Sequence, residues 1–153
     1  MPVGRQLRTA VKPIRVANAT AAGTTDVNTD FVDVQNADGV RFTVMFGALT
    51  ANQVTSVLLQ GACLSNYADA ANLLDSTTGN VIRTANLADT DSNKIASVEV
   101  YFPKVRYVRA VIKRGTANAV IDGALASLIL RNPLKYTASS TEAVSASGDF
   151  AKI

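Results

Sequence analysis

Histidine and tryptophan are absent from the 153 residues, and cysteine occurs once, as Cys63. Without histidine, the Ser-His-Asp and Cys-His mechanisms and histidine-based metal sites are excluded. A single cysteine excludes both an intramolecular disulfide and a cysteine cluster that holds a metal. Because Cys63 ends an apolar run, we expect a buried and unreactive thiol there.

Long apolar runs are also missing, because Arg5, Arg8, Lys12 and Arg15 interrupt the N-terminal segment. We therefore expect no secretory signal, and no stretch approaches the ~20 apolar residues that cross a membrane. The phosphate-binding motifs G-x-x-x-x-G-K-[ST] and G-x-G-x-x-G and the G-x-S-x-G nucleophile elbow do not occur. These absences predict a protein that is not an enzyme, uses no cofactor and binds no membrane.

One acidic segment is similar to the start of a calcium-binding loop. Asp89-Thr-Asp-Ser-Asn93 matches D-x-D-x-N, but Lys94 stands at the sixth position and Val100 at the twelfth. An EF-hand loop needs glycine and glutamate there, for a sharp turn and a bidentate ligand. We interpret the segment as a polar loop and predict no metal site.

The residues that are abundant favour strands. The chain has 24 alanines, 18 valines and 15 threonines but 2 glutamates, and 48% of its residues are hydrophobic against 18% charged. β-branched residues favour strands, and a chain of this length forms one domain. Alternation is cleanest from Val40 to Gly47, and Gly123 predicts a bulge within a long run. Other strands are expected over residues 31–34, 54–63, 96–102, 105–113 and 119–130.

Short strands separated by turns predict an all-β fold, a single β-sandwich or jelly roll with extended N- and C-terminal arms. We expect an N-terminal basic arm and loop at 1–29, with at most a short strand at 14–16. The sandwich domain then spans 30–135, and a C-terminal tail spans 136–153. Residues 66–74 are the stretch expected to form a helical turn. The predicted core consists of Val40, Phe42, Val44, Phe46, Val57, Leu59, Val98, Val100, Val108, Ile112, Leu128 and Leu130.

Charge is segregated along the chain, although the net charge is only +3. Residues 1–25 carry four bases and no acid, residues 26–93 have a net charge of −6, and residues 94–153 have a net charge of +5. One interpretation is an ordinary solvated surface. The other is that basic and acidic faces meet between copies or on a larger assembly. Nucleic-acid binding is not expected, because the chain lacks a dense basic stripe and aromatics make up only 6% of it.

The candidate interface residues come from two basic segments. In the second segment, a charged strand face that resists edge-to-edge pairing explains the pattern equally well. The candidates are Arg5, Arg8, Lys12, Arg15, Arg106, Arg109, Lys113 and Arg114.

Three segments resemble structural proteins of tailed bacteriophages. They are residues 30–47 (DFVDVQNADGVRFTVMFG), residues 58–74 around Tyr67-Ala-Asp69, and residues 107–133, which begin Tyr-Val-Arg-Ala-Val-Ile-Lys. The resemblance is to small virion proteins whose jelly-roll-like β-sandwiches decorate or cement capsids. It implies a structural protein of the virion that binds the major capsid protein at the outer capsid surface and stabilises the head. It further implies synthesis in the host cytoplasm and self-association as a homotrimer.

Two other functions stay open. The first is a tail or head–tail connector component. The second is a carbohydrate-binding β-sandwich, which needs exposed aromatic platforms, whereas the four tyrosines are spread along this chain. If the basic arm grips a neighbour or the shell, deletion of residues 1–16 should weaken particle binding and leave the sandwich folded. High salt should weaken binding as well, since exposed ion pairs are screened.

Overall fold

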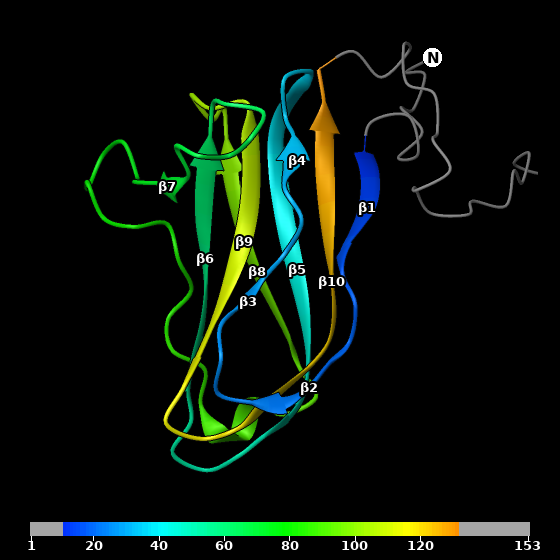
Figure 1. Cartoon of the computed structure of the whole chain (residues 1–153), viewed down its shortest axis with the longest axis vertical. Helices are drawn as coiled ribbons and strands as arrows, with labels where there is room; N and C mark the ends of the chain where they lie inside the picture. Colours follow the sequence, from blue (N-terminus) through cyan, green and yellow to red (C-terminus); the bar gives the residue numbers. More distant parts are fainter. Residues whose placement is uncertain (1–10, 132–153) are drawn as a thin grey trace, which may run out of the picture.

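The computed structural model describes residues 11–131, and two antiparallel sheets in it pack face to face (Figure 1). Sheet A contains β1 (Val11–Ala17), β2 (Thr20–Gly23), β5 (Ala37–Leu49), β8 (Ile95–Tyr101) and β10 (Ala119–Leu130). Sheet B contains β3 (Val27–Asn28), β4 (Val32–Asp33), β6 (Val54–Ala62), β7 (Ala71–Asn72) and β9 (Tyr107–Gly115). Within residues 11–131 the one helix is η1 (Asp89–Asp91), a 3-10 turn, and no helix there is suited to crossing a membrane.

Strand pairing follows the jelly-roll pattern. The order in sheet A is β1-β10-β5-β8, and the order in sheet B is β3-β9-β6-β7, with β4 also paired to β9. Strands from the first half of the described chain therefore pair with strands from the second half, as expected when two Greek keys form a double sheet. The predicted all-β sandwich is confirmed.

The core lies between the sheets and is centred on β5, which pairs with β10 on one side and β8 on the other. Its alternating side chains Val40, Phe42, Val44 and Phe46 are all buried. Every predicted core residue belongs to this core, with Val100 and Leu130 as partly buried members at its margin. The predicted bulge is present at Gly123, where φ is 151° and the β10–β5 register shifts.

The predicted arm boundary at residue 30 is wrong for the described part of the N-terminal segment. β1 pairs with β10 from Val11, which lies opposite Ile129, and Val16 is buried in the core. The short strand expected at 14–16 lies within β1, but Pro13 and the nearby bases hid the rest of the strand, because they break the apolar alternation. β1 is an edge strand, where proline and charged residues are tolerated. Residues 1–10 and the tail predicted at 136–153 lie outside the described residues.

Two local predictions near residue 65 are also wrong. Residues 66–74 form turns and then β7 instead of a helical turn, because side chains accept the backbone hydrogen bonds there. The carboxylate of Asp69 accepts the amide N–H groups of Cys63 at 2.8 Å and Leu64 at 3.2 Å. Cys63 is exposed, since it begins this loop and does not end a buried strand.

Candidate interaction face

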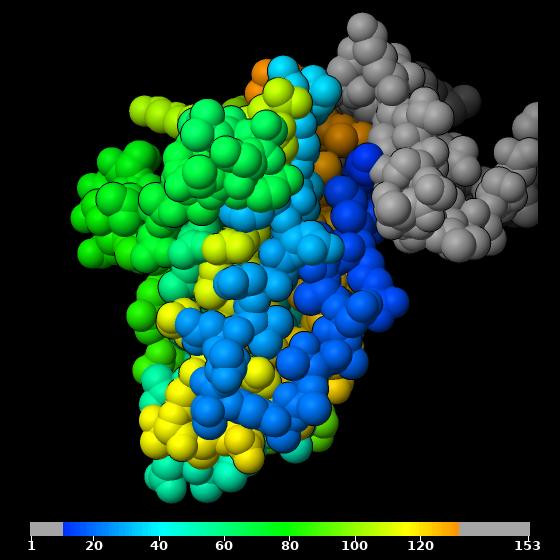
Figure 2. Space-filling view, in the orientation of Figure 1, coloured from blue at the N-terminus to red at the C-terminus, as the bar shows by residue number. Residues whose placement is uncertain are grey.

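The outer face of sheet B carries a group of aromatic and basic side chains. On β9, Val108, Ala110 and Ile112 point into the core, so Tyr107 and Arg109 lie on the opposite face. The short strand β4 pairs with β9, with Asp33 opposite Tyr107, and brings the preceding Phe31 to the same face. Figure 2 shows the N-terminal part of the described chain, in blue, lying across this side of the molecule.

Phe31 is at the centre of this group. Its ring stacks on Tyr67 with centroids 4.1 Å apart, and Tyr67 meets Tyr107 edge-on at 5.3 Å. The guanidinium carbon of Arg109 lies 4.7 Å from the centroid of Phe31, and that of Arg106 lies 5.1 Å from the centroid of Tyr107. Each such contact contributes about 0.5–1.5 kcal/mol. We call this surface the Phe31 face; it consists of Phe31, Asp33, Tyr67, Arg106, Tyr107 and Arg109.

Tyr67 reaches the Phe31 face because its loop is held in an unusual conformation. Its φ is 58°, which is uncommon for a bulky residue, and its side chain is 39% exposed. The Asp69 carboxylate fixes the loop through its two backbone amide partners. The hydrogen bond from the Cys63 amide is the main cause that lowers the pKa of Asp69 below its usual value. The loop is therefore built to present the tyrosine ring.

The two arginines of the Phe31 face differ in their partners. Arg109 donates from Nε at 3.0 Å and from Nη2 at 2.7 Å to the amide oxygen of Gln60. Among residues 11–131 no carboxylate forms an ion pair with Arg109. Arg106 pairs with Asp33 at 2.9 Å, and this hydrogen bond raises the pKa of Arg106. Gln60 thus orients the Arg109 guanidinium without neutralising it.

A cleft adjoins the Phe31 face and shares Phe31 and Asp33 with it. The cleft has a volume of about 380 Å³ and lies between β1 and the segment before β4, and Lys12, Arg15 and Asp30 also line it. Together, the Phe31 face and the cleft contain four basic residues and two acidic ones, Asp30 and Asp33. The structure therefore brings four of the predicted interface residues to one net positive surface: Lys12, Arg15, Arg106 and Arg109.

The other four predicted interface residues do not join this surface. Arg5 and Arg8 lie outside the described residues. Lys113 forms an ion pair with Asp26. Burial raises the pKa of Asp26, but hydrogen bonds from the Lys113 side chain and the Arg114 amide lower it by more. Lys113 is thus tied to the segment between β2 and β3.

Arg114 is the clear error among these predictions. Its exposed fraction is only 8%. Arg114 follows Ile112 by two residues on β9, so its side chain points to the same inner side of the sheet. The guanidinium donates to the carbonyl oxygens of Thr25, Ala21 and Ala119 at 2.6, 3.0 and 2.8 Å. Arg114 therefore has a structural role inside the sandwich and is not available to a partner.

Four residues of this site were not predicted from the sequence, namely Phe31, Gln60, Tyr67 and Tyr107. They are up to 76 residues apart in the sequence, and the pairing that joins them is long-range. Strand parity on β9 was the available signal, because it places Tyr107 and Arg109 on one face and Arg114 on the other.

The segment at 89–93 is engaged in local contacts. The Asp91 carboxylate accepts the Ala88 amide and pairs with Lys94, and Asp89 accepts the Asn52 amide. Within residues 11–131 no group of three or more aspartate, glutamate or cysteine side chains is arranged to hold a metal ion.

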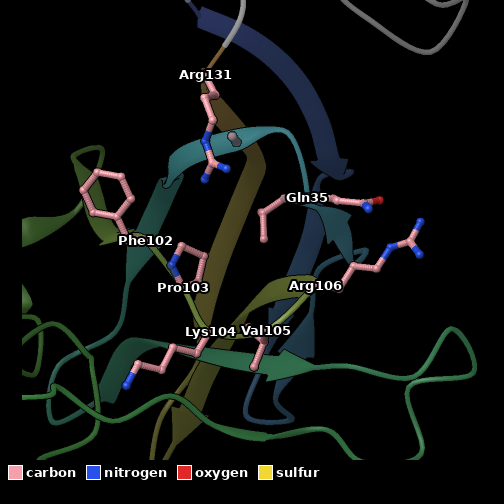
Figure 3. Close-up of a pocket in the computed structure, with 9 residues that line it drawn as sticks. Gln35, Phe102, Pro103, Lys104, Val105, Arg106 and Arg131 are labelled. Atoms are coloured by element: carbon pink, nitrogen blue, oxygen red, sulfur yellow. The ribbon is translucent and has the colours of Figure 1, made fainter.

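A second hollow of about 380 Å³ lies at one end of the sandwich, next to Arg106 (Figure 3). Phe102 on its rim is 69% exposed and has a φ of 47°. Lys104 and Arg106 point away from the hollow in opposite directions in Figure 3. Lys104 thus adds a base at this end of the molecule, near Arg106 of the Phe31 face.

No protein-family model matches the chain, and no curated protein matches it. Among solved structures, the SPBc2 prophage-derived protein YomS is 10% identical with a TM-score of 0.39, and the match covers 76% of this chain and 93% of that one. A structure of infectious bursal disease virus, Gt strain, is 13% identical with a TM-score of 0.27, and the match covers 79% of this chain and 42% of that one. Similarity at these levels carries no argument about function.

Proposed function

We propose that this protein is a structural component of a virion, which binds through the Phe31 face to an acidic surface of the outer capsid and stabilises the head. The partner in this proposal is the major capsid protein. The observation that carries the proposal is the grouping of Arg106 and Arg109 on the Phe31 face, which includes the exposed Tyr67, with Lys12 and Arg15 in the adjoining cleft. The sequence resemblance supplies the biological setting.

The Phe31 face has the chemistry of a protein–protein contact. Arginine and tyrosine dominate binding hot spots, and positive surfaces steer and orient acidic partners. Arg109 is already held by Gln60 and Phe31, so little side-chain entropy is lost when a carboxylate binds it. A partner with paired carboxylates and an apolar patch complements this surface.

The same geometry disfavours carbohydrate binding. Tyr67 and Arg109 both pack against the ring of Phe31, so this ring offers no free face to a sugar. Tyr67 is the exposed member of the aromatic group, which leaves one ring rather than an extended platform. A tail or connector role uses the same basic surface with another partner, and the binding experiment separates it from capsid decoration.

The test measures co-sedimentation of the purified protein with phage heads that lack it, and separately with tails and connectors. We expect binding to heads, and Arg109→Gln should weaken it about tenfold or more, as for an arginine hot spot. Arg83→Gln is the matched control, because Arg83 is exposed, bonds to Asn86 and is not part of the Phe31 face. Higher salt should weaken binding of the unmodified protein.

Binding to tails or connectors, and not to heads, would support the connector role. Equal head binding by Arg109→Gln and Arg83→Gln would exclude the Phe31 face as the contact. The truncation predicted from sequence also needs correction: removal of residues 1–16 deletes most of β1, so removal of residues 1–10 is the variant that tests the arm.

A further inference from the structure

β8 is an edge strand of sheet A, and one of its two sides is open among residues 11–131. Its other side pairs with β5 over seven consecutive residues without a register shift. The amide of Phe46 donates to Lys94 O at 2.9 Å, and the amide of Phe102 donates to Asp38 O at 2.7 Å. Because backbone groups alternate along a strand, even-numbered residues of β8 bond to β5. The N–H and C=O groups of the odd-numbered residues therefore point to the open side.

β8 lacks the features that protect other edge strands of the described chain from pairing with a further strand. β1 contains Pro13, flanking bases and a register shift, while β3, β4 and β7 have two residues each. Proline, charge, bulges and short length are the usual devices that prevent strands from pairing across an edge. β8 is seven residues long, contains no proline or lysine, and pairs with β5 without a bulge. Its edge is suited to pairing with another strand.

The side chains beside this open edge favour association. Ile95 is 65% exposed and Tyr101 is 53% exposed, although both are large and hydrophobic. Glu99 is the one charged residue of β8, and Arg41 on β5 pairs with it at 2.6 Å. The outer surface along the edge is therefore apolar at both ends of β8, and in the middle the charge of Glu99 is balanced by Arg41.

We propose that β8 pairs with β8 of a second copy of this chain, in antiparallel orientation around a twofold axis at Val98. In this register Ile95 lies opposite Tyr101 of the second copy, and Ser97 lies opposite Glu99. Each of these pairs uses residues whose backbone groups point to the open side, and it exchanges two N–H···O=C bonds. Aromatic residues pair well with β-branched ones across strands, and a hydroxyl opposite a carboxylate donates to it. Sheet A then continues from one copy into the other.

A register with Glu99 opposite Glu99 places like charges together and is disfavoured. The register centred on Val98 avoids this clash and matches both chemical pairs, which is why we choose a second copy as the occupant of the edge. The resulting assembly is a dimer, in contrast to the threefold assembly expected from the sequence resemblance.

Sedimentation equilibrium of the purified full chain over a wide concentration range tests the pairing, with substitutions at Ser97. Ser97→Pro removes an N–H that β5 does not use, so the monomer should fold while the dimer is lost. Ser97→Glu faces Glu99 of the second copy and should raise the dimer dissociation constant about tenfold or more. Ser97→Lys faces the same carboxylate and should leave the dimer intact or tighten it. Ser76→Glu is the control, because it adds the same charge at an exposed position in the turn after β7, outside β8 and its partner strand β5.

Dimerisation of the unmodified chain and of the Ser97→Lys and Ser76→Glu variants, with loss in Ser97→Pro and Ser97→Glu, is the expected result. A monomer at all concentrations, or a trimer that Ser97→Pro does not change, would overturn the proposal. Equal weakening by Ser97→Glu and Ser97→Lys would reject the register. Thermal melts of each variant establish that the sandwich itself remains folded.

Discussion

Replacement of Arg114 by methionine should destabilise the sandwich strongly. The guanidinium is buried and donates to three carbonyl oxygens, those of Ala21 and Thr25 in and just after β2 and that of Ala119 on β10. Methionine fills much of the same volume but donates nothing, so the carbonyls that are shielded from water lose their partners. With charged hydrogen bonds worth about 1.5–3 kcal/mol each, and partial compensation by water, we expect a loss of roughly 3–5 kcal/mol.

A loss of this size should lower the melting temperature by roughly 10–15 °C in a domain of this length. Arg109→Met is the matched control, because Arg109 is on the same strand but bonds to a side chain on the outer face. Chemical denaturation and calorimetry give the free energies of unfolding of both variants. If Arg114→Met melts within a few degrees of the unmodified protein, or no lower than Arg109→Met, our account of Arg114 is wrong.

Three further predictions concern the core and the Tyr67 loop. Phe42→Ala should lower the free energy of unfolding by about 3–5 kcal/mol, since the ring is fully buried; a small change in denaturant midpoint would contradict this. The lowered pKa of Asp69 means that its ionised form stabilises the loop fully above pH 3.8, and that this contribution is lost as pH falls through the lower folded value. Near-ultraviolet circular dichroism of Tyr67 should therefore change reversibly in acid, and Asp69→Asn should show the acid form at neutral pH; an acid response that survives in Asp69→Asn would refute this. Gly61→Ala should lower the free energy of unfolding by about 1–3 kcal/mol, because the new Cβ would lie 2.7 Å from the Val105 side chain. An unchanged melting temperature would contradict this and show that Val105 moves aside without cost.

The central strands could be predicted from sequence because burial there follows a simple alternation. β5 is covered by the core on one side, so its apolar residues recur with period two. For β1 only a short strand at 14–16 was expected, and its full extent could not be found in this way. It lies at an edge, and Pro13 with its neighbouring bases is compatible with pairing on one side only. The helical turn expected at 66–74 was wrong because side chains there, such as those of Asn66 and Asp69, accept backbone N–H groups, which composition does not show.

The interaction face could be predicted only in part, for a related reason. The basic residues were visible as charge clusters, but their grouping depends on the long-range pairing of β4 with β9 and on the position of β1 across the cleft from β4. Tyr67 joins them through a loop with positive φ, which no periodicity indicates. Arg114 was misassigned although its parity with Ile112 marks it as inward, because a charged residue is rarely fully buried.

The pairing of Val11 with Ile129 has a mechanical consequence. Both ends of the described chain leave the sandwich at the same end, from neighbouring antiparallel strands (Figure 1). A force that separates these two points peels β1 from β10 one hydrogen bond at a time, so the molecule should open at low load. A force that pulls both points in the same direction, along the strands and away from the rest of the sandwich, instead loads the strand pairs in shear. The long ladder of hydrogen bonds between β10 and β5 then shares that load. The protein should therefore hold firmly when both ends are anchored to one surface and yield easily when they are drawn apart, a difference that single-molecule pulling in the two geometries measures.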